Sequence, residues 1–363
     1  MKKTKRVRFD FYAAQRVLDP NYDSEARSVA DKVRKYLTNN SWFGKRQLEK
    51  YQKRLEELNQ LQRTSNTGYW DIAALVEYAC RSDIHITHPS SSSDLLEIDK
   101  TTYFNQDDDL LAFQVTTLRS HDIPAKKKPG QARKDFELDD DEYIGEFTQV
   151  IYDTRFHTVA IQSTKHGASV KSVESLLNEI DRLMHPNRVE IGCFQPIVDP
   201  EVIDRVSNAR KFKKITLKCS ERTYGLQGVA DHFSQARSFL NSGIESYTME
   251  VSIGFTGRSP EQTLSRDQVN AVISSFKAIQ DDPLIDTNTK NDYGVDVTYY
   301  DDHNDKYVTV DLLVPKLHFF ISVEMEARKV VQSDYMYELV IDAYKQVEGQ
   351  LSHIMYHRKR EGG

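Results

Sequence analysis

Two adjacent aspartates near the end of the chain have the spacing that most resembles a catalytic centre. They stand in the run Tyr299–Asp302. Polymerase palm domains carry such a pair on a hairpin, because adjacent carboxylates can hold the two metal ions of nucleotidyl transfer. However, the segment Asp301–Asp305 is rich in Asp and Asn, which hairpin turns favour for their backbone geometry. No upstream aspartate can be assigned to a neighbouring strand, so we interpret the pair as turn residues.

Other catalytic patterns are incomplete or absent. A nuclease of the restriction type needs an aspartate followed by a strand with Glu-x-Lys, and the chain offers Asp153 followed by Gln162 and Lys165. Glutamine is a poor metal ligand and the spacing is wrong. His85 and His88 would need further ligands to hold a metal. Glycine-rich phosphate loops and the zincin and hydrolase motifs are also absent. We therefore predict no catalytic residue, no metal site and no cofactor.

Two clusters of cations have the residue types that contact phosphate groups. The first stands in residues 125–134, where Pro129 and Gly130 predict an exposed loop. The second stands at the start of a predicted strand. The expected nucleic-acid-binding residues are Lys126, Lys127, Lys128, Arg133, Lys134, Lys211, Lys213 and Lys214. Phosphate contacts carry no sequence information, so we expect non-specific binding of double-stranded DNA.

These cations also have a simpler interpretation as solvated surface. The acidic run Asp139–Glu142 follows the first cluster and would neutralise the loop if the two segments paired. Phe212 stands between the lysines of the second cluster, where it either joins the core or stacks on a base. The net charge of −6 argues against a dedicated basic domain. It does not argue against a local patch, because only contacting charges release counterions.

Composition indicates a soluble, folded protein. Apolar residues make up 39% and charged residues 29% of the 363 positions, and this length suits two domains. No apolar run reaches the ~20 residues that a membrane-spanning helix requires. Cys80, Cys193 and Cys219 lie far apart, which argues against a disulfide framework. We therefore expect a cytoplasmic location.

Hydrophobic periodicity predicts strands and helices in irregular alternation. The clearest unit spans residues 143–183, with strands at 144–152 and 158–163. The helix that follows has an expected inner face of Val173, Leu176, Leu177, Ile180 and Leu183. In the second half, strands are predicted at 214–219, 248–255 and 317–323, a hairpin at 295–313, and helices at 229–240, 265–279 and 333–351. A further helix within 45–63 carries a stripe of Leu48, Tyr51, Leu55 and Leu58, which either packs on its own domain or forms a dimer contact.

The frequent hairpins favour an α+β fold, with mostly antiparallel mixed sheets covered by amphipathic helices. We predict two domains. Residues 1–195 form an N-terminal α+β domain with the helical insert and the basic loop, and residues 196–363 form a C-terminal α+β domain that ends in the long helix. The residues expected to be buried are Leu176, Ile180, Val272, Phe276 and Val340.

Two regions resemble known proteins. Residues 142–153 together with 159–169 resemble uncharacterised bacterial proteins found among mobile elements and phage-defence genes. The C-terminal third, where the acidic turn Asp301–Asp305 runs into a helix with Met336 and Tyr337, is similar to the A component of the lambdoid-phage Rex exclusion system. The starting segment Phe9–Ala13 suggests a shared order of elements. The resemblance implies a two-domain, homodimeric, DNA-binding protein that triggers defence through a partner.

The leading hypothesis is therefore a non-catalytic DNA-binding accessory or sensor component of a bacterial anti-phage system of the abortive-infection type. Its partner would be a membrane or effector protein encoded nearby. Two alternatives stay open from the residues alone. One is a divergent metal-dependent nuclease that uses Asp153 or Asp301. The other is a protein-interaction module without nucleic-acid contact.

Overall fold

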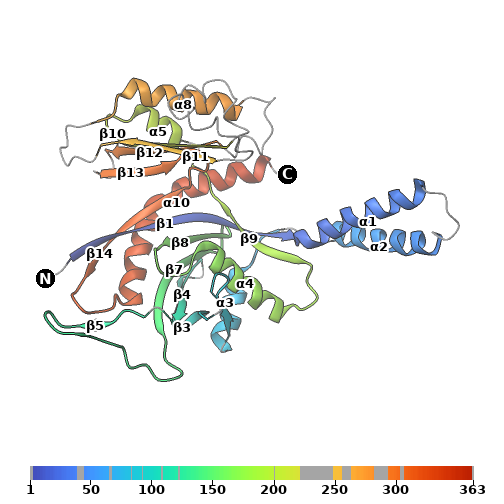
Figure 1. The fold of residues 1–363 in the computed structure, drawn as a ribbon, viewed down its shortest axis with the longest axis horizontal. Coiled ribbons are helices and arrows are strands. Elements are labelled where there is room, and N and C mark those ends of the chain that lie inside the picture. Colours follow the sequence, from blue (N-terminus) through green and yellow to red (C-terminus); the bar gives the residue numbers. More distant parts are fainter. Residues whose placement is uncertain are drawn as a thin grey trace. The chain divides into compact units, whose positions relative to one another are not determined.

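The chain folds into two compact units of α+β structure (Figure 1). The computed structural model describes residues 3–38, 45–64, 68–82, 84–91, 93–107, 109–121, 123–199, 201–220, 248–255, 263–281, 293–302 and 306–361. Unit 1 comprises Met1–Ile197 and His318–Gly363, and unit 2 comprises Val198–Leu317. The paired strands of both units are antiparallel, which confirms the predicted fold class.

Unit 1 is built on an eight-stranded sheet with the order β14-β1-β8-β7-β4-β3-β2, in which β9 also pairs with β1. The long strand β1 pairs with β14 through its first half, with β8 through its middle and with β9 through its second half. The strands are β1 (Lys3–Leu18), β2 (His85–Thr87), β3 (Leu95–Asp107), β4 (Leu110–Arg119), β7 (Ile144–Asp153), β8 (Thr158–Ser163), β9 (Glu190–Pro196) and β14 (His318–Met325). A separate two-stranded ribbon consists of β5 (Lys126–Lys127) and β6 (Arg133–Lys134).

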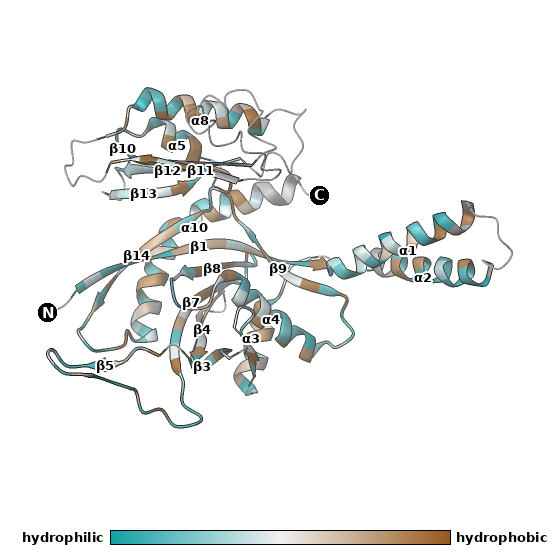
Figure 2. Cartoon of the chain, viewed as in Figure 1, coloured by the Kyte–Doolittle hydropathy of each residue, from teal (hydrophilic) through white to brown (hydrophobic). Residues whose placement is uncertain are grey.

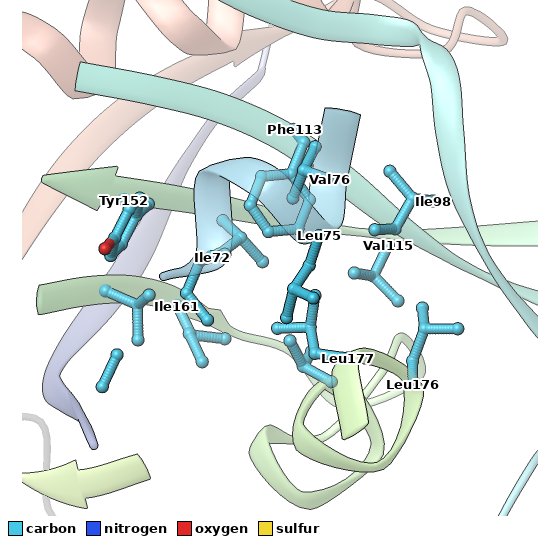
Figure 3. Packing of buried hydrophobic residues seen from close by; sticks show 14 of the residues in the cluster. Ile72, Leu75, Val76, Ile98, Phe113, Val115, Tyr152, Ile161, Leu176 and Leu177 are labelled. Atoms are coloured by element: carbon cyan, nitrogen blue, oxygen red, sulfur yellow. The ribbon is translucent and has the colours of Figure 1, made fainter. Parts of the chain in front are cut away.

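One face of this sheet packs under α3 (Ile72–Arg81) and α4 (Val170–Met184). Figure 3 shows the shared core, in which Leu75 from α3 and Leu177 from α4 meet Phe113 and Val115 from β4. The predicted unit of hairpin and helix within 143–183 is confirmed, and Leu176 and Ile180 are buried as expected.

The expected inner position of Leu183 is wrong, because its side chain is 53% exposed. The α-helical period places residues four positions apart on one face, so Ile180 is followed inward by Met184. Met184 packs against the core in its place.

The other face of the sheet packs under α10 (Ser333–Glu361). Phe11 of β1 lies 5.7 Å from the ring of Tyr344 on this helix and 5.5 Å from Phe319 of β14. Val340 is fully buried there, as predicted. Aromatic pairs at these separations add specific geometry to the burial of apolar area. Two amphipathic layers therefore enclose one sheet (Figure 2).

Two further helices, which follow β1 in the chain, pack on each other. They are α1 (Pro20–Thr38) and α2 (Lys45–Thr64). Arg54 of α2 pairs with Glu25 of α1 at 2.9 Å, and Leu58 is buried. Leu48, Tyr51 and Leu55 are half-buried. The predicted stripe thus packs within its own unit, and a dimer contact at this stripe stays a prediction.

The compact units differ from the two contiguous domains that we predicted. The first boundary falls at Ile197, close to the expected residue 195. The second difference is larger, because β14 and α10 belong to unit 1. The first half of β1 needs a pairing partner, which β14 supplies, and Phe9 and Phe319 stack across this pair with centroids 5.1 Å apart. Periodicity identifies a strand but not the sheet that it joins.

Unit 2 contains a four-stranded sheet with the order β11-β10-β12-β13. Its strands are β10 (Phe212–Ser220), β11 (Thr248–Gly254), β12 (Gly294–Asp301) and β13 (Lys306–Asp311), and its helices are α5 (Val202–Asn208) and α8 (Arg266–Asp281). The predicted hairpin is confirmed as β12–β13, and Val272 and Phe276 of α8 are buried as expected. The helix predicted at 229–240 lies outside the described residues. No described helix of either unit has both the length and the apolar character to cross a membrane.

Gly192 of β9 gives a direct test of the unit 1 core. A Cβ atom at this position would lie 2.0 Å from Cε2 of Trp70, whose side chain is fully buried. The ring cannot withdraw from a close-packed interior without disturbing its neighbours. We predict that Gly192→Ala lowers the free energy of unfolding by about 1–3 kcal/mol or more, measured by urea denaturation.

The matched control is Gly349→Ala in α10, where a Cβ would meet no atom within 4 Å. Alanine favours a helix interior over glycine, so this variant should gain about 0.5–1 kcal/mol. Equal stability of Gly192→Ala and the unmodified protein would contradict the packing described here.

Candidate nucleic-acid interface

The first basic cluster forms a small β-ribbon in unit 1. Lys126 pairs with Lys134 and Lys127 with Arg133. The connecting turn is closed by a hydrogen bond of 3.1 Å from the Gln131 N–H to the Lys128 carbonyl. Gly130 has φ +75°, as position i+2 of a type II turn requires, and proline precedes it at i+1. The five cations predicted here are all exposed, and Figure 2 shows the segment as hydrophilic.

The acidic run that follows forms no ion pair with this ribbon among the described residues. The Asp139 N–H donates to Glu142 Oε2 at 3.1 Å, and the Glu142 N–H donates to the Asp139 carbonyl at 3.0 Å, so the run closes a turn of its own. Within the described part of the chain, none of the five ribbon cations has a carboxylate within ion-pair distance. Lys126 instead lies 4.6 Å from the centre of the Phe136 ring. The described ribbon cations are therefore not held in ion pairs.

The second cluster stands at the start of β10 in unit 2. Phe212 is fully buried, and its N–H donates to Thr263 Oγ1 at 2.8 Å. The alternative in which Phe212 stacks on a base is therefore wrong. A bulge between residues 212 and 214 interrupts the pairing with β12 and leaves Lys213 unmatched, and Lys213 and Lys214 are both exposed. Bulges re-aim side chains in this way.

Two tyrosines accompany these lysines, and sequence reasoning missed them. Lys211 Nζ lies 5.6 Å from the ring centre of Tyr300, and Lys213 Nζ lies 5.6 Å from that of Tyr307. Tyr300 and Tyr307 are direct cross-strand partners of β12 and β13, with ring centroids 5.4 Å apart in an edge-to-face arrangement. The predicted hairpin contained the signal, because its register sets these residues opposite each other. The two basic clusters lie in different units.

The carboxylate proposed for a nuclease, Asp153, is engaged inside unit 1. It is fully buried and accepts hydrogen bonds from Arg155 Nη2 at 2.7 Å and from the Tyr344 hydroxyl at 2.5 Å. Arg155 also pairs with Glu348 of α10 at 2.6 Å. Burial, and then the neighbouring carboxylate, raise the pKa of Tyr344 above its usual value, so the hydroxyl remains a donor. The side-chain hydrogen bond with Asp153 raises the pKa of Arg155.

The remaining nuclease residues do not gather around Asp153. Gln162 Oε1 accepts from the Gln149 N–H at 3.0 Å, and Lys165 is exposed beyond the end of β8. A buried carboxylate held by a guanidinium and a phenol has a structural role as an ion pair. This arrangement offers no open ligand position.

The other metal candidates are also separated or engaged. His88 accepts from the Ser90 N–H at 3.1 Å through Nδ1, and its Nε2 lies 3.2 Å from Ser172 Oγ. Asp302 lies 3.9 Å from Arg210 Nε at the end of β12. Among the residues that the structure describes, no three His, Cys, Asp or Glu side chains form a group that fits a metal ion.

The chain belongs to the DUF6731 family, a family of unknown function, whose model matches residues 50–360. The matched residues include the basic ribbon, the second cluster of lysines with Tyr300 and Tyr307, and nearly all of α10. The match confirms the expectation that the chain belongs to an uncharacterised family. No curated protein matches the chain.

Tyr344→Phe tests the structural role of Asp153. The substitution removes the hydroxyl donor but keeps the ring that packs on Phe11. A hydrogen bond to a charged group contributes about 1.5–3 kcal/mol, so we predict a loss of this size in the free energy of unfolding, measured with urea.

Tyr335→Phe is the matched control. Its hydroxyl accepts only an exposed hydrogen bond of 3.3 Å from the Glu324 N–H among the contacts of the described chain. Its stability should change by no more than about 0.5 kcal/mol. Equal changes in the free energy of unfolding for the two substitutions would show that the hydrogen bond from Tyr344 to Asp153 does not stabilise the fold.

Proposed function

We propose that this protein is a non-catalytic DNA-binding accessory or sensor component of a bacterial anti-phage system, acting in the cytoplasm. The observation that carries the DNA-binding part is the basic ribbon, whose five cations stay exposed and without carboxylate partners among the described residues. The anti-phage part is supported by the resemblance to phage-exclusion proteins.

The ribbon suits contact with a duplex backbone. Its cations lie within nine consecutive positions, so several phosphates are within reach of one short segment. The ribbon has only two residue pairs, and an isolated two-stranded ribbon is only marginally stable on its own. Each phosphate neutralised releases condensed counterions, and this release drives binding without sequence preference. We therefore assign non-specific affinity for double-stranded DNA to residues 126–134.

The geometry around the acidic residues supports a role without catalysis. Asp153 is held by Arg155 and Tyr344, and Asp302 lies close to Arg210. Hydrolysis of a phosphodiester by two metal ions needs carboxylates that are free to coordinate them. A binding role makes no such demand.

The biological context in this proposal comes from the resemblance. It implies a homodimer and a membrane or effector partner encoded nearby. A neighbouring gene for such a protein would support defence, whereas a neighbouring gene of ordinary metabolism would count against it.

The ribbon is tested by replacing Lys126, Lys127 and Lys128 with glutamate. Affinity for duplex DNA should fall uniformly across unrelated sequences. The slope of log K against log salt should become shallower by about 0.9 for each phosphate that the variant no longer neutralises. Gel-shift titrations at several salt concentrations measure both quantities.

The control carries the same change in net charge at scattered exposed positions, through Lys53→Glu, Lys165→Glu and Lys345→Glu. It should keep most of the affinity and the slope. If the two triple variants bound DNA equally well, the ribbon would be only a solvated connection. The DNA-binding role proposed for residues 126–134 would then be contradicted.

Nuclease activity is the alternative to be measured alongside. Purified protein incubated with supercoiled plasmid and Mg²⁺ or Mn²⁺ should leave the plasmid intact. Cleavage that persists through purification and disappears in Asp153→Ala or Asp301→Ala would establish the nuclease instead. Because Asp153→Ala removes a buried ion-pair partner, its folding must be checked by circular dichroism.

A further inference from the structure

The sheet of unit 2 has one face that its two described helices, α5 and α8, do not cover. Alternate residues of β10 and β12, such as Ile215, Leu217 and Val297, are buried on the side where α8 packs. Successive residues of a strand point to opposite faces. The intervening residues therefore form a second face, and among them Lys214, Ser252 and Thr309 are exposed.

Side chains on this second face lie in rows that cross the strands. The Thr298 and Thr309 hydroxyls lie 2.8 Å apart, and the Thr216 and Ser252 hydroxyls 2.9 Å apart. The next row toward the start of β10 is the pair Tyr300 and Tyr307. The face thus changes from hydroxyl groups, with Asp296 and Asp311 in the row of Thr216, to aromatic rings at the end where the lysines stand.

Rings and cations on one surface match two different parts of a nucleotide. Tyrosine rings stack on bases of any sequence, and lysines contact the phosphates that link them. Lys211 and Lys213 each lie 5.6 Å from the centre of one ring, so a phosphate and a stacked base would be met together. The nearby carboxylate of Asp302 has its own cation in Arg210, at 3.9 Å.

A duplex cannot use these rings, because its base faces are stacked on one another. A single strand exposes them and can turn its bases onto a protein surface. We propose that the face of unit 2 formed by Lys211, Lys213, Lys214, Tyr300 and Tyr307 binds single-stranded nucleic acid without sequence preference. The inference rests on the proposed function, since it extends nucleic-acid contact from residues 126–134 to the three lysines of unit 2, and it assigns single strands to them in place of a duplex.

The test uses the full-length protein and fluorescence anisotropy with three labelled probes. These are a mixed-sequence 20-nucleotide DNA strand, the RNA strand of the same sequence, and the corresponding DNA duplex. Tyr300→Ala combined with Tyr307→Ala should weaken single-strand binding by about 5- to 100-fold. Tyr300→Phe combined with Tyr307→Phe keeps both rings and should bind as the unmodified protein does. Duplex affinity should change by less than about twofold in both variants.

The outcomes separate this inference from the proposed function. Unmodified protein that binds neither single strands nor duplex would overturn both. Normal duplex binding with single-strand affinity unchanged by the alanine pair would overturn the stacking face alone. An equal loss for single strand and duplex would also overturn it, because stacking acts on unpaired bases only. The DNA and RNA arms determine which strand is the better ligand.

A measurement on the unmodified protein covers the case in which the alanine pair fails to fold. A single strand carrying 5-iodouracil is irradiated with the full-length protein, and the crosslinked peptides are identified by mass spectrometry. Crosslinks at Tyr300 or Tyr307 are expected, because aromatic side chains stacked on this base react with it. Crosslinks confined to other segments would overturn the inference.

Discussion

The buried carboxylate of Asp153 joins the C-terminal helix to the hairpin of β7 and β8. It sits at the end of β7, and its partners are Arg155, two residues later, and Tyr344, which lies 191 positions away on α10. Removing Arg155 would leave a charge poorly compensated in the interior, which costs several kcal/mol, whereas loss of the Tyr344 hydroxyl removes one charge-assisted hydrogen bond. Arg155 reaches α10 a second time through Glu348. The helix that covers one face of the sheet is thereby tied to the tip of a hairpin in the middle of that sheet.

Unit 2 is inserted between two segments of unit 1. Because β14 and α10 must return to the sheet that β1 begins, residues 198–317 leave unit 1 and come back to it. The two ends of this segment lie side by side, since Val198 bridges to Lys316 and the Asp199 N–H donates to the Pro315 carbonyl at 2.7 Å. Asp199 is also paired with Arg205 of α5. Residues 126–134 lie in a connection between strands, and the face of unit 2 with Lys211, Lys213, Lys214, Tyr300 and Tyr307 lies in an inserted unit. Binding residues at such places can vary without disturbing the core.

The sequence predicted local structure well and long-range pairing poorly. The unit within 143–183, the β12–β13 hairpin and the burial of Val272 and Val340 depend on short-range periodicity, and the structure confirms them. The sheet that β14 joins depends on β1, more than 300 positions earlier, and no local pattern encodes that pairing. The predicted burial of Leu183 was wrong because the inner face of a helix shifts over several turns. Met184 takes the inner position instead.

The candidate site shows the same division. The lysines were recognisable by type, and their exposure followed from Pro129 and Gly130. The structural role of Asp153 could not be recognised from the sequence, because its partner Tyr344 is distant in sequence. Tyr300 and Tyr307 required the register of a hairpin, which fixes a cross-strand pair only once both strands are aligned. Residue type therefore identified the cations, whereas pairing identified the rings beside them.

Hydrogen exchange of the full-length protein, with and without saturating duplex DNA, tests most directly whether nucleic acid meets the basic segments and leaves the Asp153 network untouched. We predict slower exchange of amides within residues 126–134 when DNA is present, and no change in the turn at 153–157 or in α10. Protection centred on the Asp153 turn, or no protection anywhere at saturating DNA, would contradict this assignment.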